Sequence, residues 1–427
     1  MRPLILLVLA FVCLVAPVIL FGTDKTSEGE DQNNHHLVVV RQVTASLCGS
    51  EGSVPIGTLL CDYPSATSPG YHLFLSLFDL MGAGNITMLR AISSLFGLGL
   101  LLSLWRILCR RTDQWTALAL TAPLLCSPYF LSGSIWLTTD VATLFFVVLT
   151  LGSLLLTTQT TATRLRCGCF AAIAVLIRQP AIWLAGPIFL SGCFARRQGS
   201  RARLGWSGAV ILPILVLVAL VLLWGGLMPP AYRSLHHAGA NFALPALAFS
   251  LLALFGLPWG IALGIRVKEW RWVMVGAAIA LLTAVVPPTS YSRDAGRWGG
   301  PLWSVVQVMP TLMDRSVVLL LLAPIGGAVV MLFVRRASEA GGVHGAAILG
   351  FSLVCLVSAL TVNTQCWERY VDLPLLALLP LLVVMGLRGG DLKQRRRLRA
   401  ACVLLAFIQI CLSVLMVYRP TLMVSAI

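Results

Sequence analysis

The sequence is poor in charge. Only 11% of its 427 residues are Asp, Glu, Lys or Arg, whereas 58% are hydrophobic; about a quarter of an average soluble domain is charged. So few charges cannot cover the surface of a water-soluble globule of this composition. Windows of about 20 mostly apolar residues, enough to cross the hydrocarbon core, follow one another along the chain. The sequence therefore predicts an all-α, polytopic membrane protein.

Acidic residues are especially scarce, at 16 against 31 Lys and Arg. This excess of positive charge does not indicate nucleic-acid binding, because no soluble domain or basic-aromatic module is present to carry it. In membrane proteins, basic residues gather in cytoplasmic loops for topological reasons. The charge balance therefore informs topology, and no nucleic-acid partner is predicted.

The motifs of soluble enzymes are missing. There is no Walker loop, GxSxG, HExxH or dinucleotide GxGxxG, and Cys167 and Cys169 are too close in sequence for common zinc spacings. We predict no metal and no other cofactor. Cys48 and Cys61 share a polar segment and would pair only if it faces an oxidising compartment; the sequence leaves both states open. Small residues such as Gly326-Gly327-Ala328 indicate close helix packing.

The apolar windows define the membrane layout. The first, Met1–Gly22, resembles a signal peptide but has no clear cleavage site, and its length favours a retained helix. A polar stretch, 23–68, follows it and holds many of the acids. The further windows are 70–86, 91–108, 115–134, 138–158, 168–195, 207–228, 244–265, 272–287, 316–334, 343–362, 373–388 and 400–418.

Basic clusters test this layout, because they should all be cytoplasmic. The clusters are Arg2, Arg106–Arg111, Arg164–Arg166, Arg196–Arg203, Arg266–Arg271, Arg335–Arg336 and Arg388–Arg399. Simple crossings throughout would put two of them outside. If 70–86 and 168–195, which is broken at Arg178-Gln179-Pro180, are instead re-entrant dips, every cluster lies inside and eleven crossings remain. Ordinary short helix pairs are the alternative. We expect 11 to 13 transmembrane or re-entrant helices in one multi-pass domain, 1–427, with 23–68 as an extracytoplasmic loop.

In this arrangement the acids converge on the outer face, so we expect a site there. Asp31, in the segment Asp31-Gln32-Asn33-Asn34-His35-His36, is the candidate general base, hydrogen-bonded by His35 or Asn34. The alternative is a solvated acidic loop. Asp62 and His72 are candidates to hold a sugar hydroxyl, although Asp62 would also serve as a turn cap. Asp140 is either a helix N-cap or a functional acid at the membrane boundary.

Two arginines are candidates to bind an anion. Arg178 lies deep in an apolar segment, where a guanidinium is costly unless it faces a cavity or pairs with an anion. Arg369, followed by Tyr370, begins a later helix and has the planar fork that binds phosphate bidentately. Interfacial anchoring is the alternative for Arg369 and Tyr370, because both residue types favour that depth.

The ordered motifs resemble the GT-C superfamily of membrane glycosyltransferases, which use polyprenyl-phosphate sugars on the non-cytoplasmic face. The resemblance rests on Asp31, Ser68-Pro69-Gly70-Tyr71, Leu89-Arg90 and Thr139-Asp140. Within it the chain is similar to the dolichyl-phosphate-glucose-dependent alpha-1,2-glucosyltransferase family, through Asp31-Gln32-Asn33-Asn34-His35, Cys61-Asp62-Tyr63-Pro64, Arg178-Gln179 and Trp367-Glu368-Arg369-Tyr370. The chain departs from that family where Gln32 replaces an acid and Glu368 replaces a proline.

The resemblance implies a GT-C-like fold and an inverting hexosyltransferase with glucose as the favoured sugar. Its partners would be a polyprenyl-phosphate sugar, a lipid-linked or cell-surface glycan acceptor and membrane lipid. Asp31 would be the base, and Arg178 or Arg369 would neutralise the leaving phosphate without a required metal. The expected location is the bacterial inner membrane, or the endoplasmic reticulum membrane in a eukaryote. A transporter or lipid flippase without chemistry is the alternative function, although the sequence lacks an inverted repeat; a structural scaffold is a third.

Overall fold

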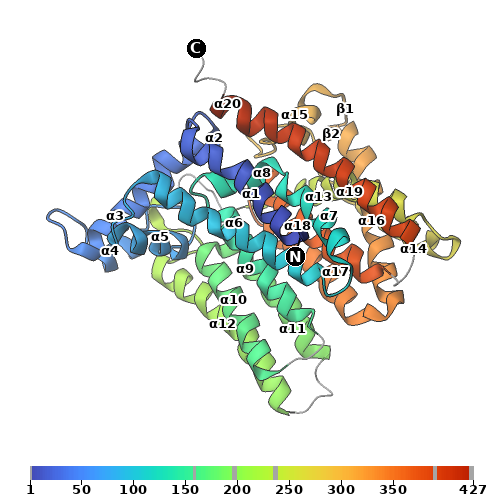
Figure 1. Cartoon of the computed structure of the whole chain (residues 1–427), viewed down its shortest axis with the longest axis horizontal. Coiled ribbons are helices and arrows are strands. Elements are labelled where there is room, and N and C mark those ends of the chain that lie inside the picture. Colours follow the sequence, from blue (N-terminus) through green and yellow to red (C-terminus); the bar gives the residue numbers. More distant parts are fainter. Residues whose placement is uncertain (1, 157–159, 195–199, 234–238, 388–391, 423–427) are drawn as a thin grey trace. The chain divides into compact units, whose positions relative to one another are not determined.

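The computed structural model describes residues 2–156, 160–194, 200–233, 239–387 and 392–422. Parts of the basic clusters at 196–203 and 388–399 therefore lie outside the described residues. The described chain is almost entirely helical, as predicted (Figure 1). Its contacts divide it into two compact units, where the sequence predicts one multi-pass domain. Unit 1 comprises Met1–Leu104, Leu125–His237 and Ile408–Ile427, and unit 2 comprises Trp105–Leu124 and Ala238–Phe407.

Unit 1 contains the helices of the first half of the chain and the C-terminal turns. Its elements are α1 (Arg2–Phe21), α2 (Ser27–Asp31), the π-helix η1 (Gln32–His36), α3 (Leu37–Cys48), α4 (Ile56–Cys61), α5 (Gly70–Leu80), most of α6 (Ile86–Leu108), α8 (Pro128–Ile135), α9 (Thr139–Leu154), α10 (Thr161–Ile177), the 3-10 helix η2 (Gln179–Leu184), α11 (Ala185–Phe194), α12 (Ser200–Trp224), η4 (Pro230–Tyr232), η7 (Val414–Tyr418) and α20 (Arg419–Leu422).

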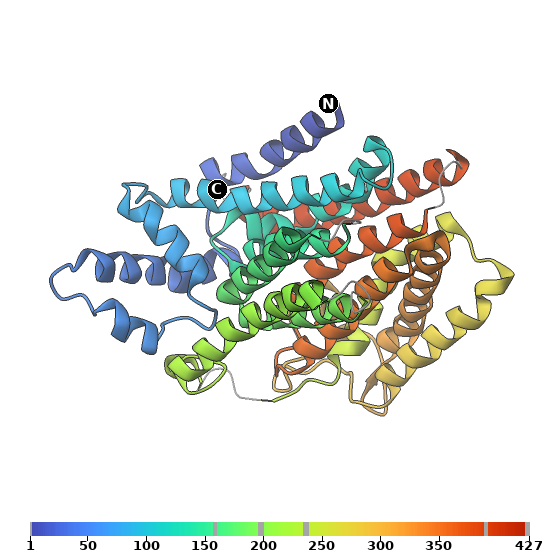
Figure 2. The same cartoon turned by 90° about the horizontal axis from the view of Figure 1, so that it is seen from below.

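Unit 2 contains most of the later helices. Its elements are α7 (Gln114–Leu125), α13 (Leu244–Leu263), η5 (Val267–Glu269), α14 (Trp270–Val285), α15 (Pro301–Val308), a hairpin of β1 (Thr311–Leu312) and β2 (Arg315–Ser316), α16 (Val317–Ala337), η6 (Ser338–Gly342), α17 (Val343–Thr361), α18 (Arg369–Gly386) and most of α19 (Leu392–Ser413). Helix α14, yellow in Figure 2, lies beside α16, in orange. A Cβ on Gly327 would collide with the Gly276 carbonyl oxygen of α14, which confirms the close helix packing predicted for Gly326-Gly327-Ala328.

Eight described helices are long and apolar enough to cross a membrane, or nine if α7 and α8 form one broken span. The protein is thus an integral multi-pass membrane protein. The eight helices are Arg2–Phe21, Ile86–Leu108, Leu204–Trp224, Leu244–Leu263, Val317–Ala340, Val343–Thr361, Arg369–Gly386 and Leu392–Leu422. Helix α5 has only 11 residues, so it is too short to span. The count of eleven crossings and their sidedness stay predictions.

One prediction needs correction. The stretch 23–68 is not a simple loop, because it contains α2, η1, α3 and α4. Two helices cover the apolar window 115–134: α7 ends at Leu125 and α8 begins at Pro128, where the Ser127 hydroxyl accepts a hydrogen bond from the Phe130 amide. The predicted break at Arg178-Gln179-Pro180 is confirmed, since α10 ends at Ile177 and a 3-10 turn follows.

Helices α3 and α5 lie side by side in unit 1 (Figure 1). Their side-chain contacts run in the same direction along both helices, at 35 or 36 residues apart in sequence. His36 is paired with His72, and the Val40 carbonyl oxygen with the Ser76 hydroxyl, both 36 residues apart. At the far end the Thr44 hydroxyl donates to Asp79 at 2.7 Å. Because these contacts repeat along both helices, they fix which residues of α3 face α5.

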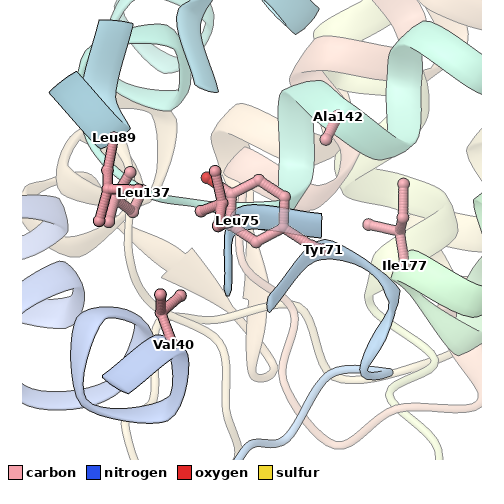
Figure 3. Packing of buried hydrophobic residues seen from close by; sticks show 7 residues of the cluster. All are labelled: Val40, Tyr71, Leu75, Leu89, Leu137, Ala142 and Ile177. Atoms are coloured by element: carbon pink, nitrogen blue, oxygen red, sulfur yellow. The ribbon is translucent and has the colours of Figure 1, made fainter. Parts of the chain in front are cut away.

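A hydrophobic cluster joins α3 and α5 to α6, α9 and α10 (Figure 3). It consists of Val40, Tyr71, Leu75, Leu89, Leu137, Ala142 and Ile177, each at most 3% exposed. Well-packed apolar groups of this kind hold their elements at fixed distances. The cluster therefore brings segments from five places in the sequence to one end of unit 1.

Gly70, the first residue of α5, permits the close approach of α5 to α10. A Cβ at this position would meet the Leu176 carbonyl oxygen at 2.8 Å and the Leu176 Cγ at 2.9 Å. We expect Gly70→Ala to lower the free energy of unfolding by about 1–3 kcal/mol, as overpacking does, seen as a lower Tm in detergent. Gly57→Ala is the control, because a Cβ there meets nothing within 4 Å. Equal Tm values in both variants would contradict the role given to Gly70.

Candidate active site

The candidate base, Asp31, lies where an α-helix changes to a π-turn. The Thr26 hydroxyl caps α2 by accepting from the Gly29 amide at 3.0 Å, and the chain continues through η1 into α3 as one helix. Single π-turns within α-helices are frequent at functional sites. The Asp31 side chain is 31% exposed, so it is held by the helix yet accessible.

The imidazole beside Asp31 is that of His36, which corrects the prediction for His35. The His36 Nε2 lies 3.8 Å from the Asp31 Oδ2, because a π-turn places residues five apart above one another. The His35 Nδ1 is instead 3.3 Å from the Tyr232 hydroxyl of η4. Tyr232 also faces Asp31: burial and then this carboxylate raise the pKa of its phenol.

His72 is fully buried, with a protein group at each ring nitrogen, and its contact with a sugar hydroxyl stays a prediction. Its Nε2 lies 2.8 Å from the His36 Nδ1, and its Nδ1 lies 2.7 Å from the Tyr63 hydroxyl. Burial, followed by the charge of His36, lowers the pKa of His72 well below its usual value. His72 is therefore neutral at physiological pH and belongs to a buried polar chain that leads to Asp31.

Gln32 ties the Asp31 segment to α6 and to the turn before α9. Its Oε1 accepts hydrogen bonds from the Arg90 Nε at 2.8 Å and from the Leu137 amide at 3.2 Å. Arg90, buried, also pairs with Asp24. A buried guanidinium needs such partners. These contacts explain why Gln32 and Arg90, neither of them a predicted site residue, are central to the site.

Asp140 and Arg178, predicted separately, form an ion pair. Asp140 lies in the first turn of α9, whose N-cap is Thr138, and Arg178 follows the last residue of α10. Their side chains are only 17% and 19% exposed. Because the Leu137 amide contacts Gln32, the pair lies at the same end of unit 1 as Asp31.

Asp62 has a local structural contact. Its Oδ1 accepts a hydrogen bond from the Ala231 amide at 2.9 Å, so the exposed carboxylate connects the end of α4 to η4. The structure does not bring it together with His72.

Cys48 and Cys61 are both free thiols.

Arg369 and Tyr370 belong to unit 2, at the start of α18. The Arg369 guanidinium lies 4.9 Å from the ring centroid of Trp367 and 5.4 Å from that of Tyr370. The preceding Glu368 is buried, and its Oε2 accepts from the Leu302 amide at 2.8 Å. Stacking on two rings holds a planar guanidinium in a defined orientation.

Among the residues that the structure describes, no group of three or more His, Cys, Asp or Glu side chains could hold a metal ion. Sequence reasoning missed His36, Tyr63, Arg90 and Tyr232 as site residues. The doubled His35-His36 was a visible signal, but choosing between the two required the π-turn.

A family model described as dolichyl-phosphate-mannose-protein mannosyltransferase matches residues 66–224, less than half of the chain. Residues 66–224, called the GT-C region below, therefore resemble a GT-C glycosyltransferase family. This region contains His72, Arg90, Asp140 and Arg178, whereas Asp31 precedes it. The finer prediction of a dolichyl-phosphate-glucose glucosyltransferase stays a prediction. No curated protein matches the chain.

Two crystal structures of one protein have a limited similarity to this chain. ArnT from Cupriavidus metallidurans bound to undecaprenyl phosphate has a TM-score of 0.41 at 13% identity, over 90% of this chain and 76% of ArnT. The apo state of the same protein has a TM-score of 0.39 at 14% identity, over 94% of this chain and 77% of ArnT. At these scores neither structure informs the roles of individual residues.

The buried Glu368 makes the stability of the protein pH-dependent. Burial, and then the charge of Asp372, raise the pKa of Glu368 to about 8. The folded state therefore holds a proton that the unfolded state releases above its ordinary pKa, about 4.5, so stability is lost as the pH rises through this window. We expect Tm in detergent to fall between about pH 5 and 8, and less so in Glu368→Gln.

Glu51→Gln is the control for this measurement, because Glu51 is exposed. It should leave the slope of Tm against pH unchanged. An identical slope in Glu368→Gln and in the unaltered protein would show that Glu368 is ionised throughout.

Proposed function

We propose that the protein is a membrane glycosyltransferase that moves a hexose, with glucose favoured, from a polyprenyl-phosphate donor to a lipid-linked glycan or a similar acceptor. One observation carries the proposal. The Asp31 segment, outside the matched region, is hydrogen-bonded to residues inside it, through His36 to His72 and through Gln32 to Arg90 and Leu137. An accessible carboxylate thus belongs to the same structure as the GT-C region.

Asp31 has the properties of a general base. A base must reach the acceptor hydroxyl and be ionised; Asp31 is partly exposed and lies beside the imidazole of His36. If the donor is beta-linked and the product alpha-linked, the reaction is a single inverting displacement. The acceptor oxygen then attacks the anomeric carbon, Asp31 takes its proton, and the polyprenyl phosphate leaves with the bonding electrons.

The leaving phosphate gains negative charge, so a positive group near it contributes most to the rate. Arg178 is the candidate in unit 1, where its pairing with Asp140 orients the guanidinium. Arg369 is the candidate in unit 2, oriented by Trp367 and Tyr370. The family whose model matches residues 66–224 is named for dolichyl-phosphate-mannose, which supports a polyprenyl-phosphate sugar as the donor class.

The experiment on Asp31 tests the function itself. We expect Asp31→Asn to lower transfer from a labelled polyprenyl-phosphate sugar by roughly two to four orders of magnitude, the scale of general base catalysis, with normal donor binding. Glu30→Gln, an exposed neighbour, and Glu28→Gln are controls and should be nearly silent. Full activity of Asp31→Asn would remove Asp31 as the base. Movement of the labelled donor across vesicles, with no transfer by the unaltered protein, would favour a transporter.

The two arginines are tested in parallel. Lysine keeps the charge but loses the planar fork, so the arginine that binds the donor phosphate should lose donor affinity and turnover in Arg178→Lys or Arg369→Lys. Arg111→Lys, at an exposed arginine, is the control. If both variants keep the parental affinity and turnover, the phosphate binds elsewhere and Arg369 is an interfacial anchor.

A further inference from the structure

Three side chains behind Asp31 form a continuous polar chain inside unit 1. The Tyr63 hydroxyl lies 2.7 Å from the His72 Nδ1, the His72 Nε2 lies 2.8 Å from the His36 Nδ1, and the His36 Nε2 lies 3.8 Å from the Asp31 Oδ2. Tyr63 and His72 are fully buried, and His36 is nearly so. The reaction described above uses none of these three groups directly.

The Asp31 carboxylate sets the favoured direction of the chain. A carboxylate oxygen only accepts, so a His36 that faces it across 3.8 Å is best oriented with its hydrogen on Nε2. A neutral imidazole has one N–H, which makes the His36 Nδ1 an acceptor and the His72 Nε2 the donor to it. The His72 Nδ1 is then an acceptor, and it receives the hydrogen of the Tyr63 hydroxyl. Each donor in the chain therefore points toward Asp31.

We infer that Tyr63, His72 and His36 are positioning residues for the base: two hydrogen bonds link the three side chains, and the His36 imidazole faces the Asp31 carboxylate at 3.8 Å, an ion-pair distance. The inference rests on the proposed function, because it assigns Asp31 the role of base. An imidazole that faces the Oδ2 limits the rotation of the carboxylate and leaves the Oδ1 for the acceptor hydroxyl.

The surroundings preserve this direction. The Tyr71 ring packs edge-on against the rings of His36 and His72, and Trp224 stacks on Tyr63 with an interplanar angle of 15°. The lowered pKa of His72 keeps this imidazole neutral. The phenol of Tyr71 is a titratable group packed against the two imidazoles. The phenol of Tyr232 faces Asp31 from η4.

The tautomers can be measured without any substrate. The protein has six histidines, and 15N labelling of their rings in lipid nanodiscs distinguishes Nδ1–H, Nε2–H and doubly protonated forms. We expect His36 and His72 to be the Nε2–H tautomers near neutral pH, with each signal assigned by its loss in His36→Gln or His72→Gln. An imidazolium at His36, or an Nδ1–H tautomer at His72, would overturn the proposed direction.

Kinetics test whether the chain acts on the base. In His36→Leu kcat should fall several-fold at unchanged donor KM, because the carboxylate loses the imidazole that orients it; His36→Gln, which keeps an N–H, should restore much of it. Tyr63→Phe should lower kcat several-fold at unchanged donor KM. Tyr71→Phe is the matched control, since its buried hydroxyl contacts Ser93 and not the chain.

The outcomes separate this inference from the proposed function. If Asp31→Asn is inactive but His36→Leu keeps the parental kcat and Tyr63→Phe matches Tyr71→Phe, the three residues have only a structural role and the inference fails. If Asp31→Asn is fully active, the proposed base fails, and with it the positioning role. The 15N measurement still decides the direction of the chain in that case.

Discussion

The parallel register of α3 against α5 is the constraint on which the site depends. At one end Asp79, whose side chain is 3% exposed, is held by Arg41 and by the Thr44 hydroxyl. Removing the partners of a buried carboxylate lowers the stability of the folded protein by several kcal/mol. Sliding α5 along α3 would separate Asp79 from its partners and is therefore strongly opposed. At the other end the same register sets His72 against His36, and this contact aligns the chain that leads to Asp31.

The hydrophobic cluster and the polar site are built from adjacent residues. Tyr71, Leu89 and Ile177 of the cluster are followed in sequence by His72, Arg90 and Arg178. Packing of each apolar side chain therefore places the polar side chain next to it, and the polar groups need little flexibility of their own. A site supported in this way is preorganised before substrate binds. Asp31 lies outside the cluster; the hydrogen bonds of Gln32 to Arg90 and Leu137, and the contact with His36 at 3.8 Å, connect it to the rest of the site.

Much of the architecture follows from the sequence, and the partners of the polar groups do not. Low charge and apolar windows sufficed for an all-α membrane protein, and Pro180, which lacks an amide hydrogen, marked the break after α10. The windows could not show that 23–68 is largely helical, because polar helices carry no hydropathy signal. Nor could they show that Asp140 pairs with Arg178, since a contact between distant segments depends on the packing of α9 against α10.

The choice of His36 over His35 has the same origin. Regular α-helical spacing puts residues three or four positions apart on one face, which favours Asn34 and His35 as neighbours of Asp31. The π-turn shifts this spacing to five, and local sequence gives no reliable sign of it. Tyr63 and Tyr232 come from segments without regular periodicity, so only their contacts in the folded chain reveal them.

The π-turn can also be regarded as one residue more than an α-helix requires between Asp31 and α3. Removing a single residue from 32–36 would let the helix continue as a regular α-helix and keep its length of apolar contact with α5. It would also rotate everything before it by about 100°, carrying Asp31 and the helix α2 to another face. A change of length between α3 and α5 would leave Asp31 in place but displace Tyr63, because Tyr63 lies in that stretch and contacts His72. The length of the chain is therefore constrained on both sides of α3, through a different site residue on each side.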